Sequence, residues 1–81
     1  MIQIEFFTTL GCHLCEDAEL LLQTPLNDGR IQIHSVDIAE GDNSDRLMEI
    51  YGLRIPVIKR LDTMDELGWP FDCEQLSHFL N

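Results

Sequence analysis

The sequence predicts an α/β domain with the element order β-α-β-α-β-β-α, in which a four-stranded mixed sheet is flanked by three helices. Three observations support this fold class. Alternating apolar residues at 2–8 are typical of a strand, and apolar residues at helical spacing follow them directly. A second strand–helix pair comes next, and then two short apolar segments separated by a turn precede a last helical segment. We expect residues 1–81 to form one domain with a small core.

The first strand is expected at residues 2–8, and Phe7 on its second face indicates that both of its faces are covered, as in a central strand. The first helix is expected from about Cys12 to Thr24, with Pro25 ending it. The apolar face of this helix is predicted to contain Leu14, Cys15, Ala18, Leu21 and Leu22.

Residues 31–38 predict the second strand, and a polar loop at 39–43 separates it from a helix at 44–51. Gly52 is expected to end that helix. Its expected buried residues are Leu47, Ile50 and Tyr51. The strand–helix–strand order predicts that the first two strands are parallel and joined by a right-handed crossover.

The last third of the chain predicts a strand hairpin and a helix. Strands are expected at 55–58 and 64–69, and the short gap between them favours an antiparallel pair. Asp72 is placed to cap the last helix, with Gln75 completing a capping box. Leu76, Phe79 and Leu80 are its expected buried residues.

The charge of the chain excludes several classes of partner. Fifteen acidic residues against five basic ones give a formal charge of −10, which argues against nucleic acid or an anionic membrane as a partner. No apolar segment approaches the length of a membrane span, and the N-terminus lacks the features of a secretory signal. We therefore expect a cytoplasmic protein, and we expect it to be a monomer.

The segment Cys12-His13-Leu14-Cys15 carries the clearest chemical signal. Residues three apart share a helical face, so Cys12 and Cys15 can approach closely enough to form a disulfide. A cysteine at a helix N-terminus lies where free backbone N–H groups and the helix dipole favour a thiolate, which is the nucleophile of disulfide exchange. Cys12 is therefore the candidate nucleophile, and Cys15, one turn further in and less exposed, is the candidate resolving thiol.

Other interpretations of the cysteines and histidines stay open. Four residues would satisfy the ligand preference of zinc if they met: Cys12, Cys15, Cys73 and His78. Cys73 is either a reactive thiol or buried filler, and we favour the second interpretation. His13 either lowers the pKa of Cys12 when protonated or simply faces solvent, and the nearby acids Glu16 and Asp17 act against a thiolate.

The predicted element order, with Cys-x-x-Cys after the first strand, resembles the thioredoxin fold in its small, glutaredoxin-like form. The resemblance covers nearly the whole chain and rests on two segments, Gly11-Cys12-His13-Leu14-Cys15 and Tyr51-Gly52-Leu53-Arg54-Ile55-Pro56-Val57. The second segment is similar to the one that places a cis-proline beside the active-site sulfurs in this superfamily. The chain departs from typical glutaredoxins in having Cys-His-Leu-Cys instead of Cys-Pro-Tyr-Cys, and Trp69 instead of the second glycine of a glutathione-binding Gly-Gly pair.

The resemblance implies a set of substrate-binding residues. Ile55, which precedes Pro56, would pair its backbone with an extended thiol substrate, as an added strand does. Arg54 would pair with a substrate carboxylate, with a surface salt bridge as the alternative. His13 and Asp72 complete the candidate set, Asp72 as the counterpart of the acidic residues that follow the glycine pair.

The sequence therefore predicts a dithiol–disulfide oxidoreductase that acts on a protein disulfide or a glutathione mixed disulfide. It predicts no resident cofactor, with glutathione as a candidate co-substrate and either glutathione or a reductase as the electron donor. The alternative is a non-catalytic binding module of the same fold, with or without a Cys/His metal site. The resemblance also raises a dimer that shares an iron–sulfur cluster, which the motif neither supports nor excludes.

Overall fold

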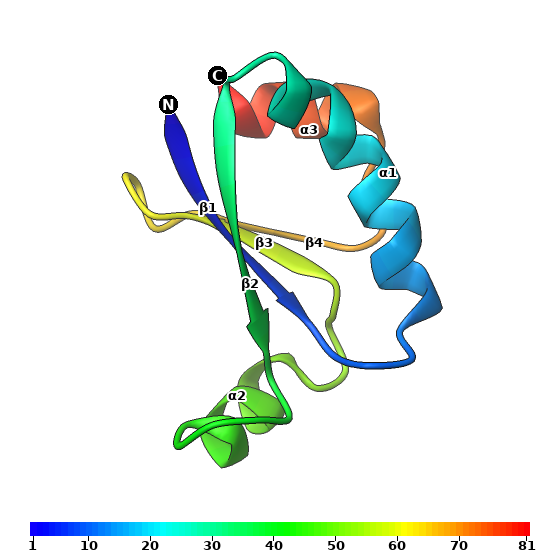
Figure 1. Ribbon diagram of the computed structural model, residues 1–81, viewed down its shortest axis with the longest axis vertical. Helices are drawn as coiled ribbons and strands as arrows, with labels where there is room; N and C mark the ends of the chain where they lie inside the picture. The colour runs from blue at the N-terminus through cyan, green and yellow to red at the C-terminus, as the bar shows by residue number, and fades with distance from the viewer.

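The computed structural model describes all residues, 1–81, and contains the predicted elements in the predicted order. These are β1 (Ile2–Thr8), α1 (His13–Asn27), β2 (Ile31–Asp37), α2 (Ser44–Tyr51), β3 (Val57–Arg60), β4 (Glu66–Gly68) and α3 (Cys73–Leu80). The strand order in the sheet is β2-β1-β3-β4 (Figure 1). β1 is parallel to β2 and antiparallel to β3, and β3 and β4 form an antiparallel pair, so the predicted mixed sheet is confirmed.

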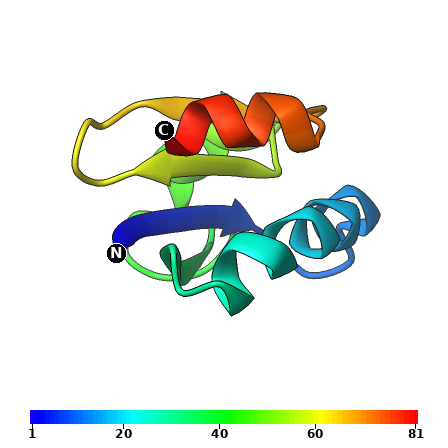
Figure 2. The ribbon, with the colours of Figure 1, turned by 90° about the horizontal axis from the view of Figure 1, so that it is seen from above.

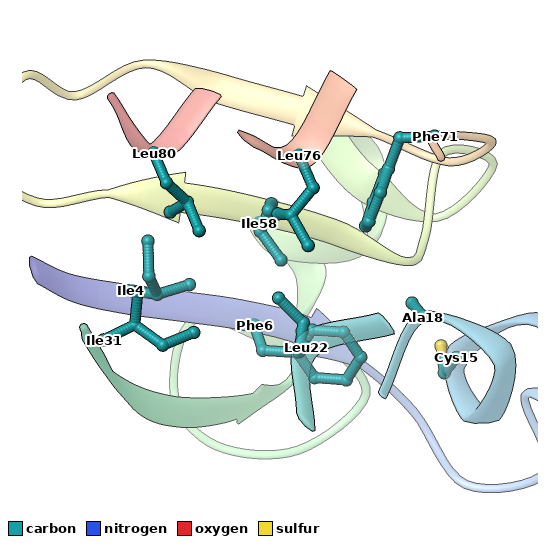
Figure 3. Packing of buried hydrophobic residues seen from close by; sticks show 10 residues of the cluster. All are labelled: Ile4, Phe6, Cys15, Ala18, Leu22, Ile31, Ile58, Phe71, Leu76 and Leu80. Carbon is teal, nitrogen blue, oxygen red and sulfur yellow. The ribbon is translucent and has the colours of Figure 1, made fainter. Parts of the chain in front are cut away.

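Helices cover both faces of the sheet because the side chains of β1 alternate between two apolar clusters. Ile4 and Phe6 belong to the larger cluster, which contains residues of α1 and α3 and is drawn in Figure 3. Phe7 points to the other face and stacks on Tyr51 of α2, with 4.2 Å between the ring centroids. The turned view in Figure 2 shows α1 and α3 lying nearer the viewer than α2. β1 is therefore central and covered on both sides, as predicted.

The expectation that Pro25 ends the first helix is wrong. Helix α1 continues to Asn27, with Pro25 inside it and buried. The proline lacks only the N–H that would bond to the carbonyl of residue 21, and the next bonds form normally, since the amide of Asp28 donates to the carbonyl of Thr24 at 3.0 Å. One missing bond in the last turn, with the ring packed inside, does not end a helix.

The predicted apolar faces of two helices are partly wrong. In α1 the buried residues are Cys15, Ala18, Leu22 and Pro25, whereas Leu14 is 49% exposed. Leu14 adjoins Cys15 in the sequence, and consecutive helical positions point about 100° apart, so both cannot face the sheet. In α2 only Tyr51 is fully buried, and Ile50 faces solvent for the same reason.

The C-terminal elements lie close to their predicted places. β3 begins at Val57 rather than at residue 55, and β4 covers Glu66–Gly68 only. The capping box at α3 is confirmed: Asp72 accepts from the amide of Gln75 at 2.8 Å, and the Gln75 side chain accepts from the amide of Asp72. None of the helices has the length and apolar character that crossing a membrane requires.

Candidate functional site

The two cysteines lie at the junction of β1 and α1, where the chain makes a tight turn. Gly11 has a φ of +78°, a conformation that a side chain would strain. Cys12 follows as the N-cap of α1, with extended backbone, and its sulfur accepts a hydrogen bond from the amide of Cys15 at 3.1 Å. The helix thus begins one residue after the predicted start. A sulfur that accepts a backbone N–H in this position is favoured in its thiolate form.

Cys12 and Cys15 form a disulfide, with their Cα atoms 5.2 Å apart. The two cysteines differ in exposure, as predicted. Cys15 is only 3% exposed and belongs to the larger core cluster, and Figure 3 shows its side chain at the N-terminal end of α1. Cys12 is partly exposed and packs against the edge of that cluster. An attacking group from solvent therefore has easier access to Cys12 than to Cys15.

A hollow of about 300 Å³ lies beside the disulfide. Its walls come from the β1–α1 turn, the first turns of α1 and the end of β2. The lining residues are Thr8, Thr9, Leu10, Gly11, Cys12, Cys15, Glu16, Glu19 and Asp37. Three of these are acidic and none is Lys, Arg or His, so the hollow has a negative wall and no positive one.

Glu19 and Asp37 are the site residues that sequence reasoning missed. Asp37 is the last residue of β2 and is paired in register with Thr8, the last residue of β1. Parallel strands end at the same edge of a sheet, so the parallel pairing predicted from sequence was the signal that could have placed Asp37 beside the cysteines. Glu19 lies four residues after Cys15, one helical turn along the same side of α1.

His13 lies on the solvent side of the motif. Its side chain is 93% exposed, and its Nδ1 is 3.8 Å from a carboxylate oxygen of Glu16, itself well exposed. Of the two interpretations of His13, the one in which it faces solvent matches the structure. In the sequence the residue still lies between the two cysteines of the disulfide.

The segment 54–56 lies outside the lining of the hollow. The peptide bond between Ile55 and Pro56 is cis, and Pro56 is buried. Ile55 is partly buried and packs against the same core cluster as Cys12. The amide of Ile55 donates to the carbonyl of Tyr51 at 3.1 Å, whereas its carbonyl takes part in no backbone hydrogen bond. Only the carbonyl of Ile55 is therefore available to pair with an added strand.

Arg54 makes the salt bridge that was its alternative assignment. Its guanidinium is 3.2 Å from a carboxylate oxygen of Glu66 and lies over the ring of Tyr51, 5.5 Å from the centroid. Glu66 also accepts a hydrogen bond from the Tyr51 hydroxyl. This bond and then the Arg54 bond hold the pKa of Glu66 below its usual value. Burial, followed by the Glu66 hydrogen bond, raises the pKa of Tyr51 to about 12.

The remaining candidate residues are not brought to the disulfide hollow. Asp72 caps α3, and its side chain accepts from Gln75. Cys73 is an exposed free thiol, so the expectation that it is buried filler is wrong. It lines a separate hollow of about 160 Å³ with residues of α1 and α3. No group of three or more His, Cys, Asp or Glu side chains is arranged to hold a metal ion, so Cys12, Cys15, Cys73 and His78 do not form the zinc site considered above.

The geometry agrees with comparisons to known proteins. The family model described as glutaredoxin-like domain (DUF836) matches residues 3–81. No curated protein matches the sequence. The solution structure of protein Ne2328 from Nitrosomonas europaea is similar, with a TM-score of 0.78 and 22% identity over 99% of this chain and 92% of that one.

Two thioredoxins have the same fold. Oxidised thioredoxin O2 from Arabidopsis thaliana has a TM-score of 0.68 and 17% identity, covering 99% of this chain and 72% of its own. Thioredoxin 1 from Thermosipho africanus has a TM-score of 0.64 and 19% identity, covering 96% and 93% respectively. At this level of identity the likeness establishes the thioredoxin fold, which is the fold class that the sequence predicted.

Proposed function

We propose that this chain, which belongs to the glutaredoxin-like domain family, is a thiol–disulfide oxidoreductase that uses Cys12 and Cys15. One observation carries the proposal. The two cysteines form a disulfide at a helix N-terminus in which one sulfur caps the helix and is partly exposed, while the other is buried in the core. That asymmetry suits an attacking thiol and a resolving thiol, whereas a purely structural disulfide needs no such difference.

The proposed reaction is a two-step exchange. In the reduced protein the Cys12 thiolate attacks a partner disulfide, forms a mixed disulfide and releases the first partner thiol. The Cys15 thiolate then attacks the Cys12 sulfur, closes the Cys12–Cys15 bond and releases the second partner thiol. Two electrons pass from the protein dithiol to the partner, and an external thiol reductant returns the protein to its dithiol form by the same exchange in reverse.

The binding side of the proposal uses the segment next to Pro56. The free carbonyl of Ile55 would accept a hydrogen bond from the backbone of an extended partner segment, in the manner of strand addition. The Ile55 amide, already bonded to Tyr51, would contribute only after that bond opens. A reducing compartment such as the cytoplasm would keep the dithiol form available, and a protein disulfide or a glutathione mixed disulfide would serve as the substrate.

A redox titration tests the proposal directly. The protein would be equilibrated in dithiothreitol and glutathione buffers, alkylated, and each cysteine read by mass. A Cys73→Ser background removes the exposed third thiol from the measurement. We expect Cys12 and Cys15 to change together as a two-electron couple, somewhere between about −120 and −270 mV.

Two variants then assign the roles. With Cys15→Ser, Cys12 should accumulate as a stable mixed disulfide with the partner, because the resolving step is lost. With Cys12→Ser, no mixed disulfide should form and reductase activity should disappear. A pair that remains oxidised or reduced throughout the titration, or a Cys12→Ser variant that keeps its activity, would leave a non-catalytic binding module as the better description.

A further inference from the structure

The hollow beside the disulfide has an acidic lining. Its ionisable wall residues, apart from the cysteines, are Glu16, Glu19 and Asp37. They come from two different elements, α1 and the end of β2, and so face the hollow from two sides. His13, the residue after Cys12, is well exposed and lies beside Glu16 rather than in the lining.

No Lys or Arg side chain lines this hollow, and two of the five basic residues are paired with acids elsewhere. Arg54 is paired with Glu66, and Arg60 is paired with Asp62. The chain as a whole carries a formal charge of −10, so its long-range field has the same sign as the hollow. A cleft lined by charges of one sign concentrates oppositely charged molecules and changes association rates by about 10- to 1000-fold.

We propose that the disulfide hollow selects cationic partners, namely disulfides whose cysteine is flanked by Lys or Arg, and that it disfavours anionic ones such as glutathione disulfide. The inference rests on the proposed function and adds the substrate class. The flanking cations would lie against Glu16, Glu19 and Asp37 while the partner sulfur meets Cys12, because all four residues line one hollow. The exposed apolar side chain of Leu10 on the same lining would contact the uncharged part of the partner segment.

The exchange itself is the one described above and balances in the same way. The protein dithiol and a cationic disulfide give the Cys12–Cys15 disulfide and two cationic thiols. The carboxylates take no part in the bond changes. They act on the encounter with the partner and on the stability of the mixed disulfide, so their effect must depend on partner charge and weaken with salt.

Three small disulfides of different charge provide the test: the dication cystamine, neutral bis(2-hydroxyethyl) disulfide and the dianion 3,3′-dithiodipropionate. The measured quantity is the rate at which each oxidises the reduced Cys73→Ser protein at low ionic strength. Dividing each rate by the rate of the neutral disulfide removes effects of the acids on the Cys12 thiol itself. Because a thiol of lower pKa leaves faster, each ratio is also divided by the same ratio measured with the free thiol 2-mercaptoethanol, which has no hollow. After both corrections we expect cystamine to react about tenfold faster than the dianion, with the difference shrinking at high salt.

Matched variants locate the effect in the hollow. Glu19→Gln and Asp37→Asn should each reduce the cation-to-neutral rate ratio by about two- to threefold, since one unit charge is removed near the reacting sulfur. Glu49→Gln, an exposed acid of α2 outside the lining, makes the same change in net charge and should leave the ratio unchanged.

The outcomes separate this inference from the proposed function. If the neutral disulfide oxidises the protein but partner charge has no effect, the selectivity is wrong while the oxidoreductase stands. If Glu49→Gln changes the ratio as much as Glu19→Gln, the preference comes from net charge and the hollow is not its source. If none of the three disulfides reacts, the proposed function itself fails.

Discussion

The Tyr51 hydroxyl donates a hydrogen bond to the carboxylate of Glu66, and this bond ties helix α2 to strand β4 across the sheet. The same carboxylate also receives the guanidinium of Arg54. The ring of Tyr51 stacks on Phe7 of the central strand, so its hydroxyl is held in place by packing as well as by the bond. The segment that leads to Ile55 and Pro56 begins at this anchored residue.

The Glu66 carboxylate should make stability depend on pH in the acid range. The two groups that donate to this carboxylate hold its pKa below the usual value. The carboxylate therefore contributes fully to folding stability above the pKa of the unfolded chain, about 4.3, and this contribution is lost as the pH falls through the lower pKa of the folded protein. Glu66→Gln should cost about 1 kcal/mol or less at neutral pH, because the carboxylate is partly exposed. Urea unfolding as a function of pH measures this.

The acid dependence has a clear control. The difference between the parent protein and Glu66→Gln should shrink toward zero as the pH is lowered, since both side chains are then uncharged. Glu40→Gln, an exposed residue of the loop before α2, should unfold like the parent at every pH. A Glu66→Gln deficit that is equally large in acid would contradict the charge-based explanation.

Tyr51 should titrate late in the folded protein. Burial and the bond to Glu66 raise its pKa to about 12, and it is the only tyrosine in the chain. Its pKa is higher folded than unfolded, so its contribution to stability is complete below pH about 10 and is lost as the pH rises toward 12. The ultraviolet absorbance of tyrosinate should therefore rise near pH 12 in the native state.

A denatured sample provides the comparison, with a midpoint near pH 10. Tyr51→Phe should remove the absorbance change while keeping the stacking on Phe7, and should lower stability by about 1 kcal/mol. A native midpoint equal to the denatured one would mean that the Tyr51–Glu66 bond does not persist in solution.

Helix α1 should derive its stability from one face only. Leu22 is buried between the helix and the sheet, so Leu22→Ala should cost about 2–5 kcal/mol through lost burial and the cavity left behind. Leu20 lies two residues away and is exposed, so Leu20→Ala should change stability by no more than about 0.5 kcal/mol. Denaturant unfolding of both variants measures the difference in the free energy of unfolding. If the two variants lost similar amounts, the face of α1 that contains Leu22 would not be the one packed on the core.

The element order could be predicted because each element has a strong local signal. Alternation marks β1, the capping box marks α3, and the turn residues separate the elements between them. The orientation of a helix has no such local signal where apolar residues adjoin. Leu14 and Cys15 are adjacent in the sequence and both apolar, so only the position of the sheet decides that Cys15 is the buried one. Pro25 stays in the helix for the same reason, because its ring has a tertiary site to fill.

The candidate site could be predicted only where it is local in sequence. The spacing of Cys12 and Cys15 predicts that they pair, and the position of Cys12 at the start of the helix predicts that it is the more exposed of the two. The acidic wall depends on the register of a parallel pair, which sets Thr8 opposite Asp37 although 29 residues separate them (37 − 8). No local pattern specifies that register, so the sequence could place Asp37 near the site only through the predicted parallel pairing of the two strands.

Arg60 should hold the C-terminal end of α3 against the sheet. Its guanidinium donates to the backbone carbonyls of Phe79 and Asn81, at 2.8 and 3.0 Å, and it is also bound by Asp62. Arg60→Met keeps much of the apolar stem but removes these donors, so the last turn of α3 should open more readily. Faster hydrogen exchange of the α3 amides, with unchanged exchange in α1, is the expected result; unaltered exchange in α3 would show that the helix end does not depend on Arg60.

In the reduced protein the two motif thiols should differ sharply in reactivity. The Cys12 sulfur accepts a hydrogen bond from the Cys15 amide and is partly exposed. Cys15 belongs to the core, so a reagent reaches its sulfur only when this part of the protein opens locally. Iodoacetamide should therefore modify Cys12 roughly tenfold faster than Cys15, with the exposed Cys73 as an internal reference thiol in the same sample. Leu22 is buried in the same core cluster as Cys15, so Leu22→Ala, which loosens the helix, should raise the Cys15 rate. Equal rates at Cys12 and Cys15 in the parent protein would mean that reduction opens the N-terminal turn, and the division into attacking and resolving thiols would then have no structural basis.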